Sequence, residues 1–309
     1  MTRDLLNILI DTPKLNAAHA KIKQWILCRF SGALIIGESG VGKAVAINVF
    51  PDTVEDRDGD LIHVYKSIVG KHDKDINRIV YEGIGELANL NVGSRTKVNR
   101  VLSGLVSFFS DVAMHNRARQ VGLFVYGAHK LTLHQLQVYS DLYSRLAAER
   151  VALTVIFVAN QREFTGLAED IQSGENEEIH ERLFQDAHQM EGIQSEEELR
   201  VVLKFFDIPL HQYDVHSSIL YTLCPRAEEA HFQLSSMASI LWSAWVQNYG
   251  DPFGQRSWLM SRFTRTIRII LGDYFPRYWE NSPSVLRDIS EKALKAAGNA
   301  PGLSAVFGE

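Results

Sequence analysis

The sequence predicts an α/β core with a mostly parallel sheet covered by helices, followed by a helical lid. Apolar runs of strand length alternate with helical segments up to about residue 159, a pattern typical of parallel strands joined by crossover helices. Strand-like runs then cease, and from about His216 onward only helical periodicity is found. We therefore expect the core to occupy residues 1–212 and the lid to occupy residues 213–309.

Each expected strand is a short apolar run, as buried parallel strands usually are. These runs are 32–37, 61–65, 121–126 and 153–159. Apolar residues at helical spacing, such as Val98, Leu102, Leu105 and Phe109, predict the intervening helices. In the core these are a first helix capped by Asn16, then 41–49, 76–90, 96–115 and 133–149; in the lid they are 217–223, 232–248, 258–275 and 283–296.

The composition is that of a folded soluble protein, because 46% of the 309 residues are hydrophobic and 22% are charged. No stretch approaches the ~20 uncharged apolar residues of a membrane span, and residues 1–4 lack a signal peptide's apolar region. The two cysteines, Cys28 and Cys224, have no metal-ligand or disulfide-framework spacing. We expect a cytoplasmic protein with no membrane partner and no metal.

Charge is distributed unevenly along the chain. The net charge of -5 excludes a globally basic nucleic-acid binder. Residues 94–120 and 256–277 are nevertheless rich in arginine and lysine, whereas residues 169–198 are strongly acidic. Solvated helix faces would explain any one of these segments. Two basic segments separated by an acidic one favour a self-associating surface that also contacts phosphates.

A glycine-rich loop follows the first expected strand. Residues 37–44 read GESGVGKA, which matches G-x-x-x-x-G-K between a strand and a helix. In such a phosphate-binding loop the glycines let successive backbone N–H groups point at phosphate, and Lys43 reaches the outer phosphates. The expected ligands of the phosphates are Gly37, Ser39, Gly40, Val41, Gly42, Lys43 and Ala44.

The groups that complete a nucleoside-triphosphatase site are missing. The residue after the lysine is Ala44, where a Ser or Thr hydroxyl would ligate Mg²⁺. The third strand is followed by Gly127 and Ala128, where a metal-binding Asp and a catalytic Glu would be expected. Because phosphoryl transfer relies on metal charge and positioning, we predict no catalytic residue, no metal and no ATPase activity. A carboxylate from elsewhere is the alternative, and the candidates are Asp111, Asp141 and Glu149.

Several segments resemble those of AAA+ ATPases. Residues 123–131 are similar to the hhhhDEAHxL segment with its two acids absent, and His129 within it is expected at the solvent edge. Residues 158–162, VANQR, are similar to the sensor-1 segment, which implies that Asn160 contacts the γ-phosphate; a structural amide that satisfies a loop is the alternative. Residues 179–193 resemble the segment that follows sensor 1. This resemblance makes Arg182 a candidate arginine finger for a neighbouring subunit, with an ion pair inside the chain as the alternative.

The order and spacing of these segments, with Thr12-Pro13 and a helix before the first strand, most resemble transposon target-selection ATPases of the TnsC and TniB type, related to IstB and MuB. The resemblance covers residues 8–215. It implies ATP binding, assembly into rings or filaments on double-stranded DNA, and recruitment of a transposase to a target chosen by a targeting protein. Combined with the missing groups, it predicts a degenerate regulator that oligomerises with itself or with other AAA+ subunits and marks target DNA.

The cofactor is expected to be ATP or ADP held without a well-formed magnesium site, or the protein is nucleotide-free. The side chains expected to contact DNA phosphates are Arg95, Lys97 and Arg100 at the start of one helix and Arg262, Arg265 and Arg268 on a lid helix. Two other functions stay open. One is an active ATPase of the same family, with a rearranged metal site, that forms ATP-dependent filaments on DNA. The other is a nucleotide-free scaffold that binds a partner through the acidic segment 169–198.

Overall fold

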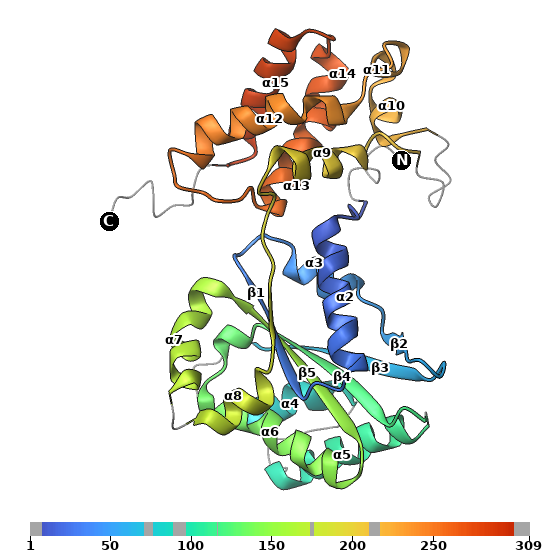
Figure 1. Ribbon diagram of the computed structural model, residues 1–309, viewed down its shortest axis with the longest axis vertical. Coiled ribbons are helices and arrows are strands. Elements are labelled where there is room, and N and C mark those ends of the chain that lie inside the picture. Colours follow the sequence, from blue (N-terminus) through green and yellow to red (C-terminus); the bar gives the residue numbers. More distant parts are fainter. Residues whose placement is uncertain are drawn as a thin grey trace. The chain divides into compact units, whose positions relative to one another are not determined.

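The computed structural model describes residues 8–70, 77–88, 97–115, 117–173, 176–209 and 217–299. The chain forms two compact units (Figure 1). One unit consists of residues 17–39 and 43–190 and contains the sheet, and the other consists of residues 1–16, 40–42 and 191–309 and contains the lid helices. The helical unit thus begins before the expected boundary at residue 212, because helix α9 (Glu196–Lys204) buries Leu199 and Leu203 in the helical cluster.

The sheet has six strands in the order β2-β3-β4-β5-β1-β6. Their bounds are β1 (Gly32–Gly37), β2 (Thr53–Glu55), β3 (Leu61–Ile68), β4 (Gln120–Tyr126), β5 (Ala152–Asn160) and β6 (Ala187–Gln189). All neighbouring strands are parallel except the antiparallel pair β2 and β3. The predicted fold class is therefore confirmed, and all four expected strands are present. Sequence periodicity missed β2 and β6, since three residues are too few to show a pattern.

Helices cover both faces of this sheet (Figure 1). They are α2 (Pro13–Leu27), α3 (Lys43–Val49), α4 (Asn77–Leu87), α5 (Val98–Met114), α6 (Leu133–Ala148), α7 (Gln161–Gln172) and α8 (Glu177–Leu183). On the α2 face, the buried Gln120 amide donates to the Ile26 carbonyl at 2.6 Å. On the opposite face, Leu105 and Phe109 of α5 pack in one apolar cluster with Val125 of β4.

Thr12, not Asn16, caps the first helix. The Thr12 hydroxyl accepts a hydrogen bond from the Leu15 backbone N–H at 3.1 Å, and Pro13 occupies the first helical position. A proline suits that position because its missing N–H would have no partner there. The expected cap at Asn16 was wrong because the sequence Thr12-Pro13 is the stronger start signal.

The helical unit has its own apolar core. Besides α9, its helices are α10 (Ile219–Leu223), α11 (Pro225–Glu229), α12 (Ala238–Trp245), α13 (Met260–Ile269), α14 (Phe275–Tyr278) and α15 (Pro283–Ala296). Trp245 and Trp258 stack at a centroid distance of 5.8 Å, and Trp258 Nε1 donates to the buried Asn299 Oδ1 at 2.8 Å. None of the helices in the described part of the chain has the length and hydropathy that a bilayer span requires.

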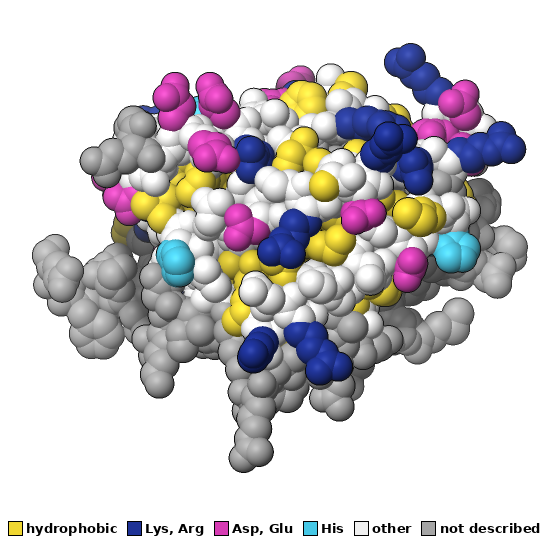
Figure 2. Space-filling model, turned by 90° about the horizontal axis from the view of Figure 1, so that it is seen from below, with side chains coloured by type: hydrophobic (Ala, Val, Ile, Leu, Met, Phe, Trp, Pro, Cys, Tyr) yellow, Lys and Arg dark blue, Asp and Glu magenta, His cyan; other side chains and the backbone are white. Residues whose placement is uncertain are grey.

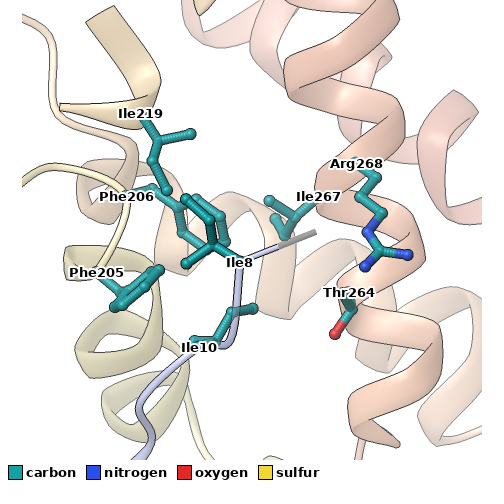
Figure 3. Close-up of a pocket in the computed structure, with 8 residues that line it drawn as sticks. All are labelled: Ile8, Ile10, Phe205, Phe206, Ile219, Thr264, Ile267 and Arg268. Atoms are coloured by element: carbon teal, nitrogen blue, oxygen red, sulfur yellow. The ribbon is translucent and has the colours of Figure 1, made fainter. Parts of the chain in front are cut away.

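A small apolar crevice lies within the helical unit (Figure 3). It is lined by Ile8, Ile10, Phe205, Phe206, Ile219, Thr264, Ile267 and Arg268. Ile8 and Ile10 come from the N-terminal segment, so this segment packs on the helical core. The crevice is therefore a packing site for residues far apart in the sequence.

Candidate phosphate site

The sheet register brings the phosphate loop and the sensor residue together. Strand β1 lies between β5 and β6, and Gly37 at the end of β1 is the register partner of Asn160 at the end of β5. The next strand, β4, ends beside β5, and the Gly127 N–H donates to the Val158 carbonyl at 2.9 Å. Ligands of α/β sheets bind at the carboxyl ends of the strands. The predicted loop and the two segments expected to flank it thus share one edge of the sheet.

The loop has the backbone conformation that a phosphate cradle needs. Gly40 and Gly42 have φ values of 89° and 110°, which side-chain-bearing residues rarely adopt. Lys43 is buried, with 7% of its surface exposed, and its Nζ donates to the carbonyls of Gly37 at 2.6 Å and Glu38 at 2.7 Å. Desolvation lowers the pKa of Lys43, and the carboxylates of Glu38 and Glu163 oppose that shift. These residues fit a bound phosphate.

The positions that should bind a metal offer no ligand. Ala44 presents only a methyl group, and Ala128 is fully buried in the turn after β4. Gly127 has φ 88° and ψ 28°, and a Cβ there would lie 3.3 Å from the Val69 carbonyl oxygen. The backbone at this strand end therefore disfavours any side chain. Among the described residues no group of three or more His, Cys, Asp or Glu side chains is arranged to hold a metal ion.

A carboxylate that sequence reasoning missed lies beside the loop. Glu163 is in the first turn of α7 and accepts a hydrogen bond from Asn160 Nδ2 at 2.6 Å. Its other oxygen, Oε2, lies 3.1 Å from His129 Nε2. The carboxylates expected as alternatives were Asp111, Asp141 and Glu149, and of these Asp141 accepts a hydrogen bond from Gln137 on the same helix, α6. The pattern N-x-x-E from Asn160 to Glu163, which resembles a helix-capping signature, could have identified the missing residue.

His129 is a positioned residue of the site, so the expectation of a solvent-edge histidine was wrong. Its side chain is 14% exposed, and its Nδ1 accepts a hydrogen bond from the Asn160 backbone N–H at 3.1 Å. Since Nδ1 is an acceptor, the neutral ring has its proton on Nε2 and donates it to Glu163. Desolvation lowers the pKa of His129, as do Lys130 and Lys43, whereas Glu163 raises it.

Asn160 supplies one donor to Glu163 and retains one acceptor without a partner. Its Oδ1 is buried and makes no hydrogen bond among the described residues. Buried acceptors are usually satisfied, so such an atom in a site points to a group that is contributed from outside the chain. Asn160, which the resemblance names as the sensor residue, thus lies at the end of β5 and interacts with a neighbouring carboxylate.

Arg182 makes its contacts within the chain. From α8 its guanidinium donates to Ser140 Oγ at 2.7 Å and Ser144 Oγ at 3.0 Å, both on α6. It also pairs with Glu178 at 3.1 Å, and it lies over the Tyr143 ring. This arrangement matches the alternative interpretation, an intramolecular ion pair.

The basic residues expected to contact DNA differ in their surroundings. Lys97 and Arg100 are exposed at the start of α5, and Arg95 lies outside the described residues. In the helical unit, Arg262 donates to the Asn299 carbonyl at 2.9 Å and Arg265 to the Ala297 carbonyl at 3.0 Å. Arg265 and Arg268 are nevertheless exposed, and Arg262 is half-buried. Arg262 and Arg265 thus bind the segment that follows α15, and Arg268 lines the crevice of Figure 3.

One face of the molecule shows how these charges are mixed. In Figure 2, Lys and Arg side chains are interspersed with Asp, Glu and hydrophobic side chains, and no continuous basic field covers that face. This agrees with the net charge of -5. Contacts with a polyanion would thus have to be local.

Comparison of the fold with solved structures defines its class. The chain is similar to the ORC2 protein of Aeropyrum pernix, solved as ADPNP–ADP complexes, with a TM-score of 0.53 and 11% identity over 94% of this chain and 69% of that one. It is also similar to the A. pernix ORC1 protein, solved in complex with DNA, with a TM-score of 0.51 and 13% identity over 93% of this chain and 66% of that one. The chain thus spans about two thirds of the length of these proteins.

These neighbours are AAA+ proteins of the ORC and Cdc6 group, and the fold of this chain is the AAA+ fold, a P-loop core with a helical lid. At such low identity the likeness establishes the fold alone. No protein-family profile matches the sequence. The search of curated proteins also gave no significant match.

Proposed function

We propose that this protein is an AAA+ assembly subunit that binds a nucleotide at the Gly37–Lys43 loop without hydrolysing it. One observation carries the proposal. The loop lysine is buried and positioned, whereas Ala44, Gly127 and Ala128 provide neither a metal ligand nor a base. A bound Mg²⁺ would supply charge that stabilises phosphoryl transfer, and this chain lacks the groups that normally hold it.

Steady-state phosphate release tests the loss of hydrolysis directly. The purified protein, with and without double-stranded DNA, is expected to release phosphate no faster than the Lys43→Ala variant. Nucleotide affinity should differ between the two proteins: Lys43→Ala should bind more weakly than the wild type, because it lacks the loop cation. Turnover by the wild-type chain that Lys43→Ala abolishes would refute the proposal of an inert subunit.

We propose further that the protein contacts the DNA backbone through Lys97 and Arg100. Both side chains are exposed at the start of α5: Lys97 is the N-cap residue and Arg100 lies in the first turn, which has no acidic residue. Cations are unfavourable at the positive end of a helix, so helix stability does not explain them, whereas an anionic partner would. The similarity to the ORC1 structure in complex with DNA supports this assignment by analogy of fold.

Salt-dependent binding to a labelled duplex without sequence preference is the expected result. The logarithm of the affinity should fall linearly with the logarithm of salt concentration, because each contacted phosphate releases counterions. The double variant Lys97→Ala/Arg100→Ala should reduce that slope by about 2. Unchanged binding by this variant would exclude the α5 contact.

The proposed role of the assembly is to mark target DNA for a transposase and to connect it with a targeting protein. The support is the resemblance of residues 8–215 to transposon target-selection ATPases. Electron micrographs with and without DNA and ATP should show rings or filaments that require DNA. Such assemblies should retain a purified transposase that is added to them. Assemblies that form on DNA but do not retain the transposase would refute the role in transposition and leave the assembly role intact.

Glu163 favours a second candidate function, an active ATPase with a rearranged site. This carboxylate is close enough to Lys43 to oppose the lowering of the lysine pKa. If it activated water, phosphate release would depend on Mg²⁺ and would be lost in Glu163→Gln. The inert subunit predicts no release in either protein, so this assay decides between the two functions.

A further inference from the structure

Glu163 contacts Asn160, the residue that the resemblance to the sensor-1 segment would place against a terminal phosphate. Asn160 Nδ2 donates to Glu163 Oε1 at 2.6 Å, and His129 Nε2 lies 3.1 Å from Glu163 Oε2. The same carboxylate interacts electrostatically with the loop lysine, Lys43. An internal anion thus contacts the sensor amide and lies within the field of the phosphate-binding cation.

We propose that Glu163 takes the place of the γ-phosphate in this site, so that the site selects a nucleoside diphosphate over a triphosphate when no divalent metal is present. This inference rests on the proposed nucleotide binding and specifies its ligand. The chain supplies through Glu163 the anion that a triphosphate would otherwise bring to Asn160.

The network around Glu163 fixes its orientation. The Asn160 amide must turn Nδ2 toward the carboxylate, since the reverse orientation would place the acceptor Oδ1 against carboxylate oxygens, which are also acceptors. The His129 ring is fixed in turn, because its Nδ1 already accepts the Asn160 backbone N–H. Glu163 also lies in the first turn of α7, where a negative charge is favourable. The contacts with Asn160 and His129 therefore orient the carboxylate, and the helix start favours its charge.

Charge makes this arrangement selective. A triphosphate would bring its terminal phosphate toward the Glu163 carboxylate. Ala44 and Gly127 supply no metal ligand, so no bound cation would neutralise these two negative groups. Like charges at short range repel, and because the Glu163 side chain is 59% exposed, water and salt screen part of this repulsion. A diphosphate avoids this contact while still reaching Lys43. We expect the preference for ADP to be about tenfold or more.

Titration calorimetry with ADP and with ATP, each in EDTA, measures this preference. The wild-type chain should bind ADP more tightly, and Glu163→Gln should reduce the ratio of the ATP and ADP dissociation constants by about tenfold. Glu169→Gln is the matched control, because Glu169 is an exposed carboxylate on the same helix. It should leave the ratio unchanged. Thermal unfolding of each variant reports whether it is folded.

A second variant keeps the test decisive if Glu163→Gln does not fold. His129→Gln removes the ring that holds Glu163 Oε2, and it should shift the ratio in the same direction by a smaller factor. Equal binding of ADP and ATP by the wild-type chain, or a ratio that neither variant changes, overturns the role of Glu163 and leaves the proposed function intact. Absence of binding of either nucleotide to the wild-type chain overturns both.

Discussion

Asn160 lies directly opposite Gly37 in the parallel register of β5 and β1. One row of the sheet thus sets the distance between the start of the phosphate loop and the sensor residue. Because the hydrogen-bond ladder fixes this row, the relationship depends on backbone pairing and not on side-chain packing. The site is therefore preorganised by the same strands that form the core.

Restoring the missing carboxylate at position 127 should destabilise the protein. Gly127→Asp places a side chain at φ 88°, with its Cβ 3.3 Å from the Val69 carbonyl. We expect a loss of about 1–3 kcal/mol in unfolding free energy, measured by urea titration. Gly83→Ala, in helix α4 with no atom within 4 Å of its added Cβ, is the control and should be neutral or stabilising. Equal stability of Gly127→Asp and the wild type would contradict the strained conformation.

Acidification should weaken the fold at mildly acidic pH. The pKa values of His129 and His188 are lowered from 6.5, chiefly by desolvation. The unfolded chain therefore binds more protons below pH 6.5, and stability is full above that value and declines as pH falls toward the folded pKa values. The pKa of Asp186 is lowered by hydrogen bonds from Lys21 and Trp25. Its contribution to stability is therefore lost only near and below pH 3.8, the ordinary pKa of this group.

Urea unfolding at several pH values between 5 and 8 measures this decline. His129→Gln should flatten the curve, because the ring no longer titrates. Stability that rises on acidification across this range would show that the histidines are charged in the folded protein.

The lid arginines should act on stability more than on DNA binding. Arg262 and Arg265 donate to the carbonyls of Asn299 and Ala297, which follow the last helix. Each substitution to alanine should cost about 1–2 kcal/mol, since a hydrogen bond from a charged donor is lost. In the matched variant, Arg100→Ala on α5, the stability should be retained and DNA affinity should fall. Comparison of thermal unfolding and duplex binding in the three variants distinguishes these roles.

Loss of Arg182 should loosen the contact between α8 and α6. Its guanidinium joins Ser140 and Ser144 of α6 to Glu178 of its own helix. Arg182→Ala should lower the unfolding free energy by about 1–2 kcal/mol in the monomer. Arg182→Lys should recover little, because an ammonium cannot reproduce the guanidinium fork. An unchanged monomer stability combined with lost assembly would instead favour the arginine finger.

Much of the fold could be predicted from the sequence, because the long strands are apolar and the helices periodic. The phosphate loop was recognisable because its glycines and lysine lie between an apolar strand, β1, and a helix, α3. Short elements were not predictable, since β2 and β6 form strands only through pairing with the longer strands β3 and β1. Tertiary contacts, and not local propensity, decide such segments.

The candidate site was predicted only where a residue sits in a recognisable motif. Lys43 and Asn160 follow apolar strands and could be named. Glu163 was missed. The N-x-x-E spacing marks it only as a capping residue, and its contact with His129 depends on tertiary structure, because His129 comes from a different strand end and accepts the backbone N–H that a capping glutamate would use. Arg262 and Arg265 were expected to contact DNA phosphates, and helical spacing does not reveal the backbone carbonyls to which they donate.

Both outer strands of the sheet, β2 and β6, are only three residues long. So short an edge presents few open backbone groups to a neighbouring molecule. Copies of this chain therefore have little means of extending one sheet into the next. Contacts between copies would therefore use side chains on the described helices and loops. Single substitutions can strengthen or weaken such contacts one residue at a time.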